Sequence, residues 1–338
     1  MTLKDARDRR DEARRQIANG KDSAKERAVA RAAAIEAETN TFSAIGRDFL
    51  AYRAADSGSP KTQVKSEWLL SLLEPTLGKK PISEIKATDI LATLNEIQLS
   101  GRRETAHRLR SFIGRVFRFA ILNGKALHDP STALKGQLHR REVKHHPTIL
   151  DREEFGTLLK AIDGYTGRPS TVAALRITPH LFQRPGEIRH MRKVDIDLEK
   201  RIWSIPAELM KMRRPHRVPL SSPAISIIRT MLARNYRTNY VFPAHHRPKL
   251  PISENCINQA LRRMGYGGVM TAHGFRSTAS TLLNESGLWN FDAIERALAH
   301  RDTDSVRSAY NRGEYWEERV RMMDWWSEKI ENLRGPQS

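Results

Sequence analysis

Four side chains in the last quarter of the sequence could together transfer a phosphoryl group to the protein. His273 and Arg276 are three residues apart, so they share one face if the segment is helical. His300 follows, and Tyr310 comes ten residues after it. Arginine offers a planar fork of donors that fits phosphate oxygens, and histidine can move a proton near neutral pH. A tyrosine hydroxyl can attack phosphorus, so this set predicts nucleophilic phosphoryl transfer.

The sequence around these residues resembles the catalytic end of the tyrosine recombinases, the phage-type integrases. The motifs that carry the resemblance are HGFRSTASTLLNE, LAHRD and VRSAYNR, in this order. The integrases of satellite prophages and genomic islands look most similar. The resemblance covers nearly the whole chain, weakly over residues 1–143 and strongly over residues 175–326.

The resemblance implies two arginines that hold the scissile phosphate. Arg184 lies in QRPGEIRHM, similar to the family's Arg-x-Gly-Glu box, at the end of a helix expected over residues 171–183. Taken alone, Arg184 would be interpreted as a surface arginine in a turn. Glu187, three residues on, would be a buried partner that orients the site, and Arg276 would be the second phosphate clamp. The family usually has a small residue before the first arginine, whereas this chain has Gln183.

The resemblance also assigns the proton carriers and the nucleophile. His273 would be a general base or hydrogen-bonding group, and His300 would donate to a phosphate oxygen. Without its neighbours, His300 would be interpreted as a histidine at the C-terminus of a helix. Tyr310 would be the nucleophile, and Tyr315 is its rival five residues later. The ten-residue gap from His300 favours Tyr310, as in the family.

A basic loop precedes the third expected strand. The family places a lysine in this hairpin, eight residues before a proline, and Lys211 and Pro219 have this spacing. The resemblance implies that Lys211 protonates the departing 5′ oxygen. Arg213, Arg214 and His216 lie in the same loop and are expected to contact phosphates.

Composition points to a polyanionic partner. The formal net charge of the 338 residues is +19, and lysine and arginine displace counterions from phosphate backbones. The alternative on charge alone is a ribosomal or merely basic soluble protein.

Cys256 is the single cysteine, and the sequence has no run of 18 apolar residues. We therefore expect a bacterial cytoplasmic, nucleoid-associated protein without a membrane partner, and neither a metal site nor another cofactor.

Three regions are expected along the chain. Residues 1–40 alternate charge with alanine and predict a helical extension, interpreted as the remnant of an arm-binding domain whose sheet does not precede it. Residues 41–143 predict a helical core-binding (SAM-like) domain, and residues 144–338 a mainly helical catalytic domain with a small antiparallel sheet and a C-terminal tail helix. The His145-His146 pair falls in the connecting segment, which is interpreted as a linker.

The helix expected over residues 102–124 has two stripes. The apolar stripe predicts core and consists of Leu109, Phe112, Ile113, Val116 and Ala120. The polar stripe is expected to contact phosphates and contains Arg108, Arg115 and Arg118. The tail after Gly313 is amphipathic, with Trp316, Val320, Met323 and Ile330 on one stripe. It would pack either on its own domain or on a neighbouring protomer.

The resemblance implies a site-specific DNA integrase that clamps duplex DNA at att-type core sites. Tyr310 would form a 3′-phosphotyrosyl link and free a 5′ hydroxyl, which later reverses the step without a nucleotide cofactor. A homotetramer on DNA is expected, together with an excision factor or a DNA-bending host protein. Three alternatives stay open: a type IB topoisomerase, a non-catalytic DNA-binding regulator and a metal-dependent nuclease, which would need clustered carboxylates that the catalytic segments lack.

Overall fold

The computed structural model describes residues 2–18, 31, 39–56, 60–140, 146–300 and 313–335. The chain divides into two compact units, residues 1–143 and residues 144–338. Each unit has its own hydrophobic core. The structure is mainly helical with one small antiparallel sheet, which confirms the predicted fold class. Within the described residues, no helix combines the length and the apolar character that crossing a bilayer requires.

The first unit is built from helices only, in its described part. Its elements are α1 (Leu3–Ala18), α3 (Phe42–Ala55), α4 (Pro60–Leu73), the π-helix η1 (Glu74–Gly78), the 3-10 helix η2 (Ile82–Glu84), α5 (Ala87–Leu99), α6 (Arg103–Leu122) and the 3-10 helix η3 (Pro130–Leu134). The predicted apolar stripe of α6 is confirmed, because all five of its residues are fully buried. Phe49 of α3 packs edge-on against Phe112 of α6, with ring centroids 6.1 Å apart.

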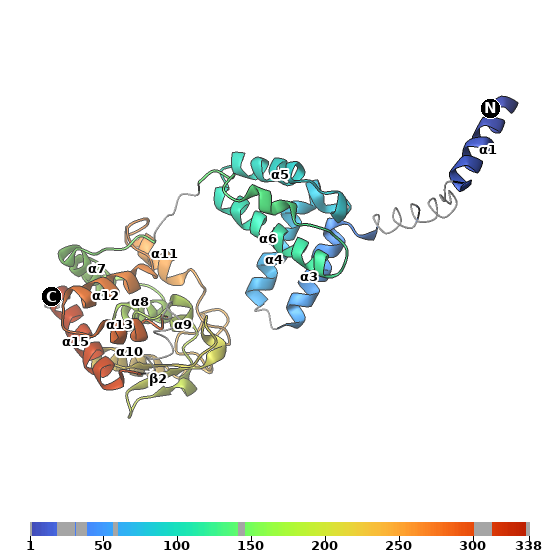
Figure 1. Cartoon of the computed structure of the whole chain (residues 1–338). Helices are drawn as coiled ribbons and strands as arrows, with labels where there is room; N and C mark the ends of the chain where they lie inside the picture. The colour runs from blue at the N-terminus through green and yellow to red at the C-terminus, as the bar shows by residue number, and fades with distance from the viewer. Residues whose placement is uncertain are drawn as a thin grey trace. The chain divides into compact units, whose positions relative to one another are not determined.

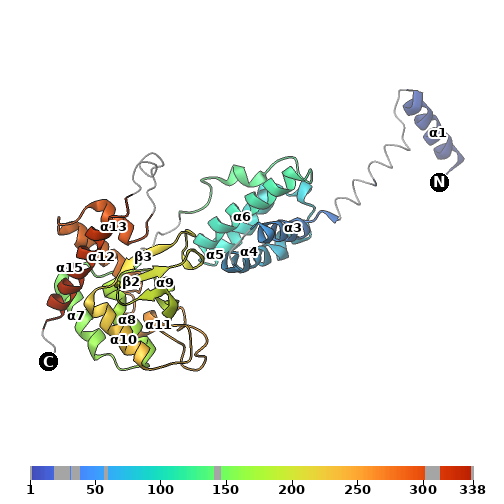
Figure 2. The same ribbon diagram turned by 90° about the horizontal axis from the view of Figure 1, so that it is seen from below.

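The second unit wraps several helices around one buried helix (Figures 1 and 2). Its elements are α7 (Arg152–Gly164), α8 (Pro169–Leu181), α9 (Pro185–Arg189), η4 (Lys193–Asp195), β1 (Ile196–Asp197), β2 (Ile202–Ile205), η5 (Ala207–Leu209), β3 (His216–Pro219), α10 (Ser222–Ala233), α11 (Cys256–Arg263), α12 (Gly274–Glu285), α13 (Phe291–Ala297) and α15 (Trp316–Arg334). In both views α8 lies at the centre, and α7, α9, α10, α11, α12 and α15 all contact it.

The predicted hairpin and third strand form the sheet. The strand order is β1-β2-β3, with both pairs antiparallel, and Trp203 of β2 is opposite Val218 of β3. Both side chains are buried, because alternate residues of a strand face the core. The sheet carries the loop with Lys211 between β2 and β3.

The tail helix α15 packs on its own unit, which is the first of the two arrangements considered. Trp326 is fully buried, and its Nε1 donates to the Pro179 carbonyl at 2.8 Å. The predicted apolar stripe was only partly right. Met323 and Ile330 are buried, but Trp316 and Val320 are only half-buried. The buried face turns toward α7 and α8, so that Met322 and Trp326 enter the core in their place.

The end of α8 prepares the chain for the site. Phe182 has a left-handed backbone with φ 39°, and Arg184 is extended with ψ 140°. The next residue is Pro185, whose ring disfavours a helical conformation in the residue before it. The helix α8 has already ended at Leu181, and α9 starts at Pro185, so Arg184 lies in the break between the two helices. This break turns Arg184 out of the helix axis.

Candidate active site

The Glu187 carboxylate accepts hydrogen bonds from both the backbone and the side chain of Arg184. The backbone N–H of Arg184 donates to Glu187 Oε2 at 2.9 Å, which caps α9. The Nη1 of Arg184 donates to Glu187 Oε1, also at 2.9 Å. Glu187 is 2% exposed, so the guanidinium compensates a carboxylate that would be costly to bury alone. The predicted pairing of these two residues is present in the structure.

Arg276 is buried and donates to two backbone carbonyls. It lies in the first turn of α12 and is 3% exposed. Its Nη1 donates to the Phe182 carbonyl at 2.8 Å and its Nη2 to the Leu298 carbonyl at 2.6 Å. Burial, and secondarily the charge of Arg184, lower the pKa of Arg276 to about 10, so it remains a cation at neutral pH. The two arginines predicted to hold phosphate therefore lie in one cluster.

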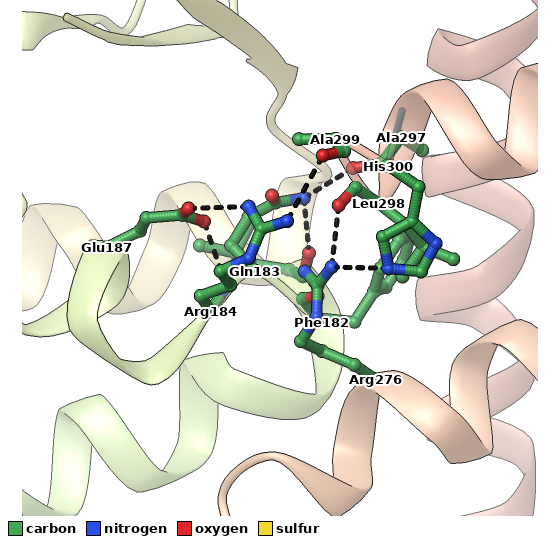
Figure 3. A network of polar contacts seen from close by, with 10 residues as sticks. Phe182, Gln183, Arg184, Glu187, Arg276, Ala297, Leu298, Ala299 and His300 are labelled. Carbon is green, nitrogen blue, oxygen red and sulfur yellow. Dashed lines mark hydrogen bonds and ion pairs between the residues drawn. The ribbon is translucent and has the colours of Figure 1, made fainter. Parts of the chain in front are cut away.

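Three consecutive carbonyls at the end of α13 collect donors from distant segments (Figure 3). The Ala297 carbonyl accepts from Gln183 Nε2 at 2.8 Å, and the Leu298 carbonyl accepts from Arg276. The Ala299 carbonyl accepts from Arg184 Nη2 at 3.1 Å. Carbonyls at a helix C-terminus lack partners within the helix, so these side chains satisfy them. Each predicted arginine is thus fixed to the turn that leads into His300.

His300 joins this cluster through both ring nitrogens. Its Nε2 lies 3.2 Å from Arg276 Nη2, and its Nδ1 lies 3.0 Å from Glu295 Oε2. A guanidinium can only donate, so Nε2 accepts and the ring proton sits on Nδ1, where it donates to Glu295. The two contacts fix the orientation of the ring.

His273 is half-buried at the N-terminus of α12. Burial first, then the charges of Arg276, His146, Arg184 and His300, lower the pKa of His273 to about 4. The ring is therefore neutral near pH 7 and able to accept a proton. His273 lies one helical turn before Arg276. A neutral imidazole that can act as a base therefore lies beside the arginine cluster.

Two further predicted catalytic residues are Lys211 and Tyr310. Lys211 is exposed in the loop between β2 and β3, and no hydrogen bond or ion pair among the described residues joins it to Arg184 or Arg276. Arg213 and Arg214 are exposed in the same loop. Tyr310 lies outside the described residues. Its rival Tyr315 is described, and its hydroxyl lies 3.4 Å from Asp292 Oδ2.

The expectation for His216 was wrong. His216 is the first residue of β3 and is 8% exposed, so it does not project from the loop toward a phosphate. Burial, then the nearby charge of Arg319, lower the pKa of His216 to about 3, against a hydrogen bond to the Ala297 backbone that raises it. A neutral buried histidine lies instead behind the turn of residues 297–300.

The predicted basic face of α6 divides into two parts. A groove of about 860 Å³ between α4 and α6 is lined by Thr62, Lys65, Ser66, Leu69, His107, Arg108, Arg110, Ser111 and Arg115. The Arg115 guanidinium lies 5.5 Å from the centroid of the Phe112 ring. Arg118 does not line this groove, and its Nη1 lies 3.8 Å from Asp129 Oδ2. The structure thus brings Arg108 and Arg115 together and sets Arg118 apart.

Residues that the motifs did not indicate also shape the site. Gln183 appeared only as a departure from the family pattern, yet it is 1% exposed and bonds two carbonyls. Glu295 lies five residues before His300, a spacing without a standard interpretation. His146 was assigned to the linker, but its ring lies against His273, with centroids 4.8 Å apart. Among the residues that the structure describes, no three metal-ligating side chains gather.

Two protein-family models and several known proteins match this chain. The phage integrase central domain matches residues 42–137, and the phage integrase family matches residues 148–316. The integrase of Enterobacteria phage P4 is 32% identical, over 99% of this chain and 79% of its own length.

Two solved structures share the fold. The Tn1549 transposon integrase in complex with transposon right end DNA has a TM-score of 0.65 and 17% identity, covering 83% of this chain and 98% of its own. A lambda integrase tetramer bound to a Holliday junction has a TM-score of 0.62 and 16% identity, covering 78% and 79%. Together with the similarity to the phage P4 integrase, the family matches show that this chain belongs to the phage integrase family, the tyrosine recombinases.

Proposed function

We propose that the cluster around residues 297–300 binds the scissile phosphate of a recombination site. The observation that carries this proposal is the convergence of Arg184, Arg276 and His300 on one turn, although they come from three separate segments. Two fixed cations supply the positive charge that a pentacovalent phosphorus needs, and the His300 ring lies beside them. The protein then integrates and excises a mobile element by site-specific recombination.

In the proposed reaction the Tyr310 oxygen forms a bond to phosphorus while the bond to the 5′ oxygen breaks. His273 takes the phenol proton, and Lys211 gives a proton to the departing 5′ oxygen. The product is a 3′-phosphotyrosyl link and a free 5′ hydroxyl. The hydroxyl of a partner strand attacks the same phosphorus and expels Tyr310, so no nucleotide is consumed.

The hydrogen bond of Tyr315 favours Tyr310 as the nucleophile. The Tyr315 hydroxyl donates to a carboxylate of α13, and its backbone begins α15 with φ 48°. A tyrosine at a helix start whose hydroxyl already donates to a carboxylate of its own unit is a poor candidate to attack a phosphate. This supports the assignment that the ten-residue gap after His300 indicated.

DNA is the proposed substrate, and several copies of the chain are proposed to assemble on it. The lambda integrase structure is a tetramer on a Holliday junction, and four active sites are what exchange of both strands requires.

Residues 41–143 are proposed as the core-binding domain, with Arg108, Arg115 and Arg118 at phosphates. Residues 144–338 are proposed as the catalytic domain, with Arg213 and Arg214 beside the duplex. Residues 1–40 would be an extension, and an excision factor or DNA-bending protein would assist at the nucleoid.

Trapping on a nicked suicide duplex tests the proposal. The duplex carries the element's own end, so cleavage releases a short fragment and leaves the protein attached. The wild type should form a covalent adduct whose attached peptide contains Tyr310, with or without a chelator. Tyr310→Phe should form none, and Tyr315→Phe should behave as the wild type. Adducts on Tyr310→Phe would contradict the assignment. Relaxation of plasmids that lack any att-like site would favour a topoisomerase.

A further inference from the structure

The chain that enters the second unit is fixed onto the start of α12. Thr148 Oγ1 donates to the Gly274 carbonyl at 2.9 Å and lies 3.1 Å from Thr278 Oγ1. Thr278 Oγ1 donates to the Ile149 carbonyl at 2.7 Å, and Ile149 is buried in the core. These bonds join segments more than 120 residues apart in sequence, so the entering chain has one defined course across the helix.

Gly274 allows this close approach. A Cβ at this position would lie 2.5 Å from the Pro147 carbonyl oxygen, which is closer than such atoms come in folded proteins. The same carbonyl accepts from Thr271 Oγ1 at 3.3 Å. The backbone of residues 147–149 therefore lies directly on the turn that begins α12. His146, the residue immediately before, has little freedom to leave this position.

His146 lies against the proposed general base. Its ring centroid is 4.8 Å from that of His273, and the two planes are tilted by 52°. Rings at this separation and tilt are in van der Waals contact. His146 is itself exposed, so it stands between His273 and solvent on that side.

We infer that His146 is a positioning residue of the active site: its ring limits the rotation of His273 and keeps water from one face of it. This inference rests on the proposed role of His273 as the proton acceptor. It also means that the course of residues 146–149 bears on the orientation of the base.

The covering ring has a consequence for the pH dependence of cleavage. The charged and titratable groups that face His273 are His146 from the entering chain, Arg276 of α12, Arg184 before α9 and His300 after α13. All of them disfavour the imidazolium, as does burial. Two carboxylates lie near this group of residues, but neither contacts His273 directly. Glu187 is hydrogen-bonded to Arg184, and Glu295 to His300. Removing His146 would hydrate His273 and raise its pKa, so more of the base would be protonated in mildly acidic solution.

Single-turnover cleavage of the suicide duplex, followed from about pH 5.5 to pH 9, tests the inference. We expect His146→Ala to cleave about threefold more slowly above pH 7, where His273 is neutral in both proteins and only its orientation is lost, and about tenfold more slowly near pH 5.5, where the raised pKa also protonates part of the base. His146→Phe keeps a ring over His273 and should recover most of the rate. The control His246→Ala removes one ring of another histidine pair, whose centroids are 4.7 Å apart, and should leave the profile unchanged.

A second variant tests the bonds that fix the entering chain. Thr148→Val has nearly the same shape but cannot donate to Gly274, and it should shift the pH profile in the same direction as His146→Ala. Thr148→Ser keeps the hydroxyl and should restore the wild-type profile. Thermal unfolding of each variant establishes that the fold is retained.

Three results would overturn the inference. They are a wild-type profile for His146→Ala, a deficit of His146→Phe as large as that of His146→Ala, and a deficit explained by weaker DNA binding alone. His273→Ala separates this failure from failure of the proposed function. If His273→Ala cleaves normally, the role of His273 as base is wrong. If it is inactive while His146→Ala is normal, only the role of His146 is wrong.

Discussion

At the scale of single residues, the site depends on side chains that hold the backbone as much as on those that face the substrate. Arg184 and Arg276 each have a guanidinium nitrogen bonded to a carbonyl of residues 298–299. Gln183 holds the preceding carbonyl but is not proposed to contact phosphate. Substituting Gln183 therefore tests how much the hydrogen bonds to the backbone contribute to activity, separately from the charges of the two arginines.

Gln183→Met should lower both stability and activity. Methionine fills a similar volume but leaves the Leu181 and Ala297 carbonyls without their donor, which costs about 1–3 kcal/mol of unfolding free energy. Loss of the fixed turn should slow cleavage about tenfold or more, because small displacements of catalytic groups are costly. Urea unfolding and suicide-duplex cleavage measure the two effects. Gln98→Met, at a buried glutamine of the first unit, is the control for stability loss without a cleavage defect.

The buried histidine of α8 should make the protein less stable in acid. Burial, and secondarily the charge of Arg334, lower the pKa of His180 to about 4, below the unfolded value of about 6.5. The folded state therefore binds fewer protons, and stability present above about pH 6.5 is lost as the pH falls toward 4, by about 3 kcal/mol. His180→Gln should flatten this part of a plot of unfolding free energy against pH. An unchanged slope would show that other groups cause the loss.

At the scale of elements, the helix α6 divides its surface between a core and a groove. Its apolar stripe is buried against α3 and α5, and its basic side chains line the groove beside α4. The Arg115 guanidinium rests over the Phe112 ring, and burial lowers the pKa of Arg115. A cation held in this way is positioned before any phosphate arrives.

Arg115→Ala should weaken DNA binding and reduce its dependence on salt. Each phosphate contact that is lost lowers the slope of log K against log salt by about 0.9. Filter binding or anisotropy at several salt concentrations measures the slope. Arg176→Ala, which removes a cation that lies 3.7 Å from Asp163 in the second unit, should leave the slope unchanged. A slope that stays at the wild-type value in Arg115→Ala would reject a phosphate contact there.

The elements were largely predictable, because their signals are local. Apolar spacing near 3.6 located the helices of residues 41–124, and alternation around a charged turn located β1 and β2. The motifs indicated Arg184, Glu187, Arg276 and His300, which the structure brings together.

The partners of these residues were not predictable, since they depend on tertiary packing. Nothing near His216 in the sequence indicates that a histidine of a basic loop starts a buried strand. The ring contact of His146 with His273 spans 127 positions, and the two histidines share no motif. The stripe of α15 was only partly right for the same reason, because the contacts with α7 and α8 decide which of its residues are buried.

At the scale of the whole molecule, the two cores share no residue. One is formed by residues 42–138 and the other by residues 149–330. Cooperative unfolding requires contacts that link the parts, and a unit with its own core can unfold by itself. The chain is therefore expected to unfold in two steps.

Calorimetry of matched core variants tests this expectation. Phe117→Ala and Phe275→Ala each remove a buried phenylalanine, 1% exposed in both cases, from different cores. Each should cost about 3–5 kcal/mol, and each should lower the temperature of one transition only. A single transition that both variants shift would show that the units unfold together.

The row of carbonyls at residues 297–299 has one more consequence. The guanidinium groups of Arg184 and Arg276 are each hydrogen-bonded to a backbone carbonyl, so they cannot follow a phosphate that has moved along the DNA helix. The position at which the enzyme is bound on the duplex then determines which phosphate is cleaved, and the ease of breaking a particular linkage does not. Inserting a single base pair between the bound sequence and the cleaved step should silence the reaction instead of relocating it.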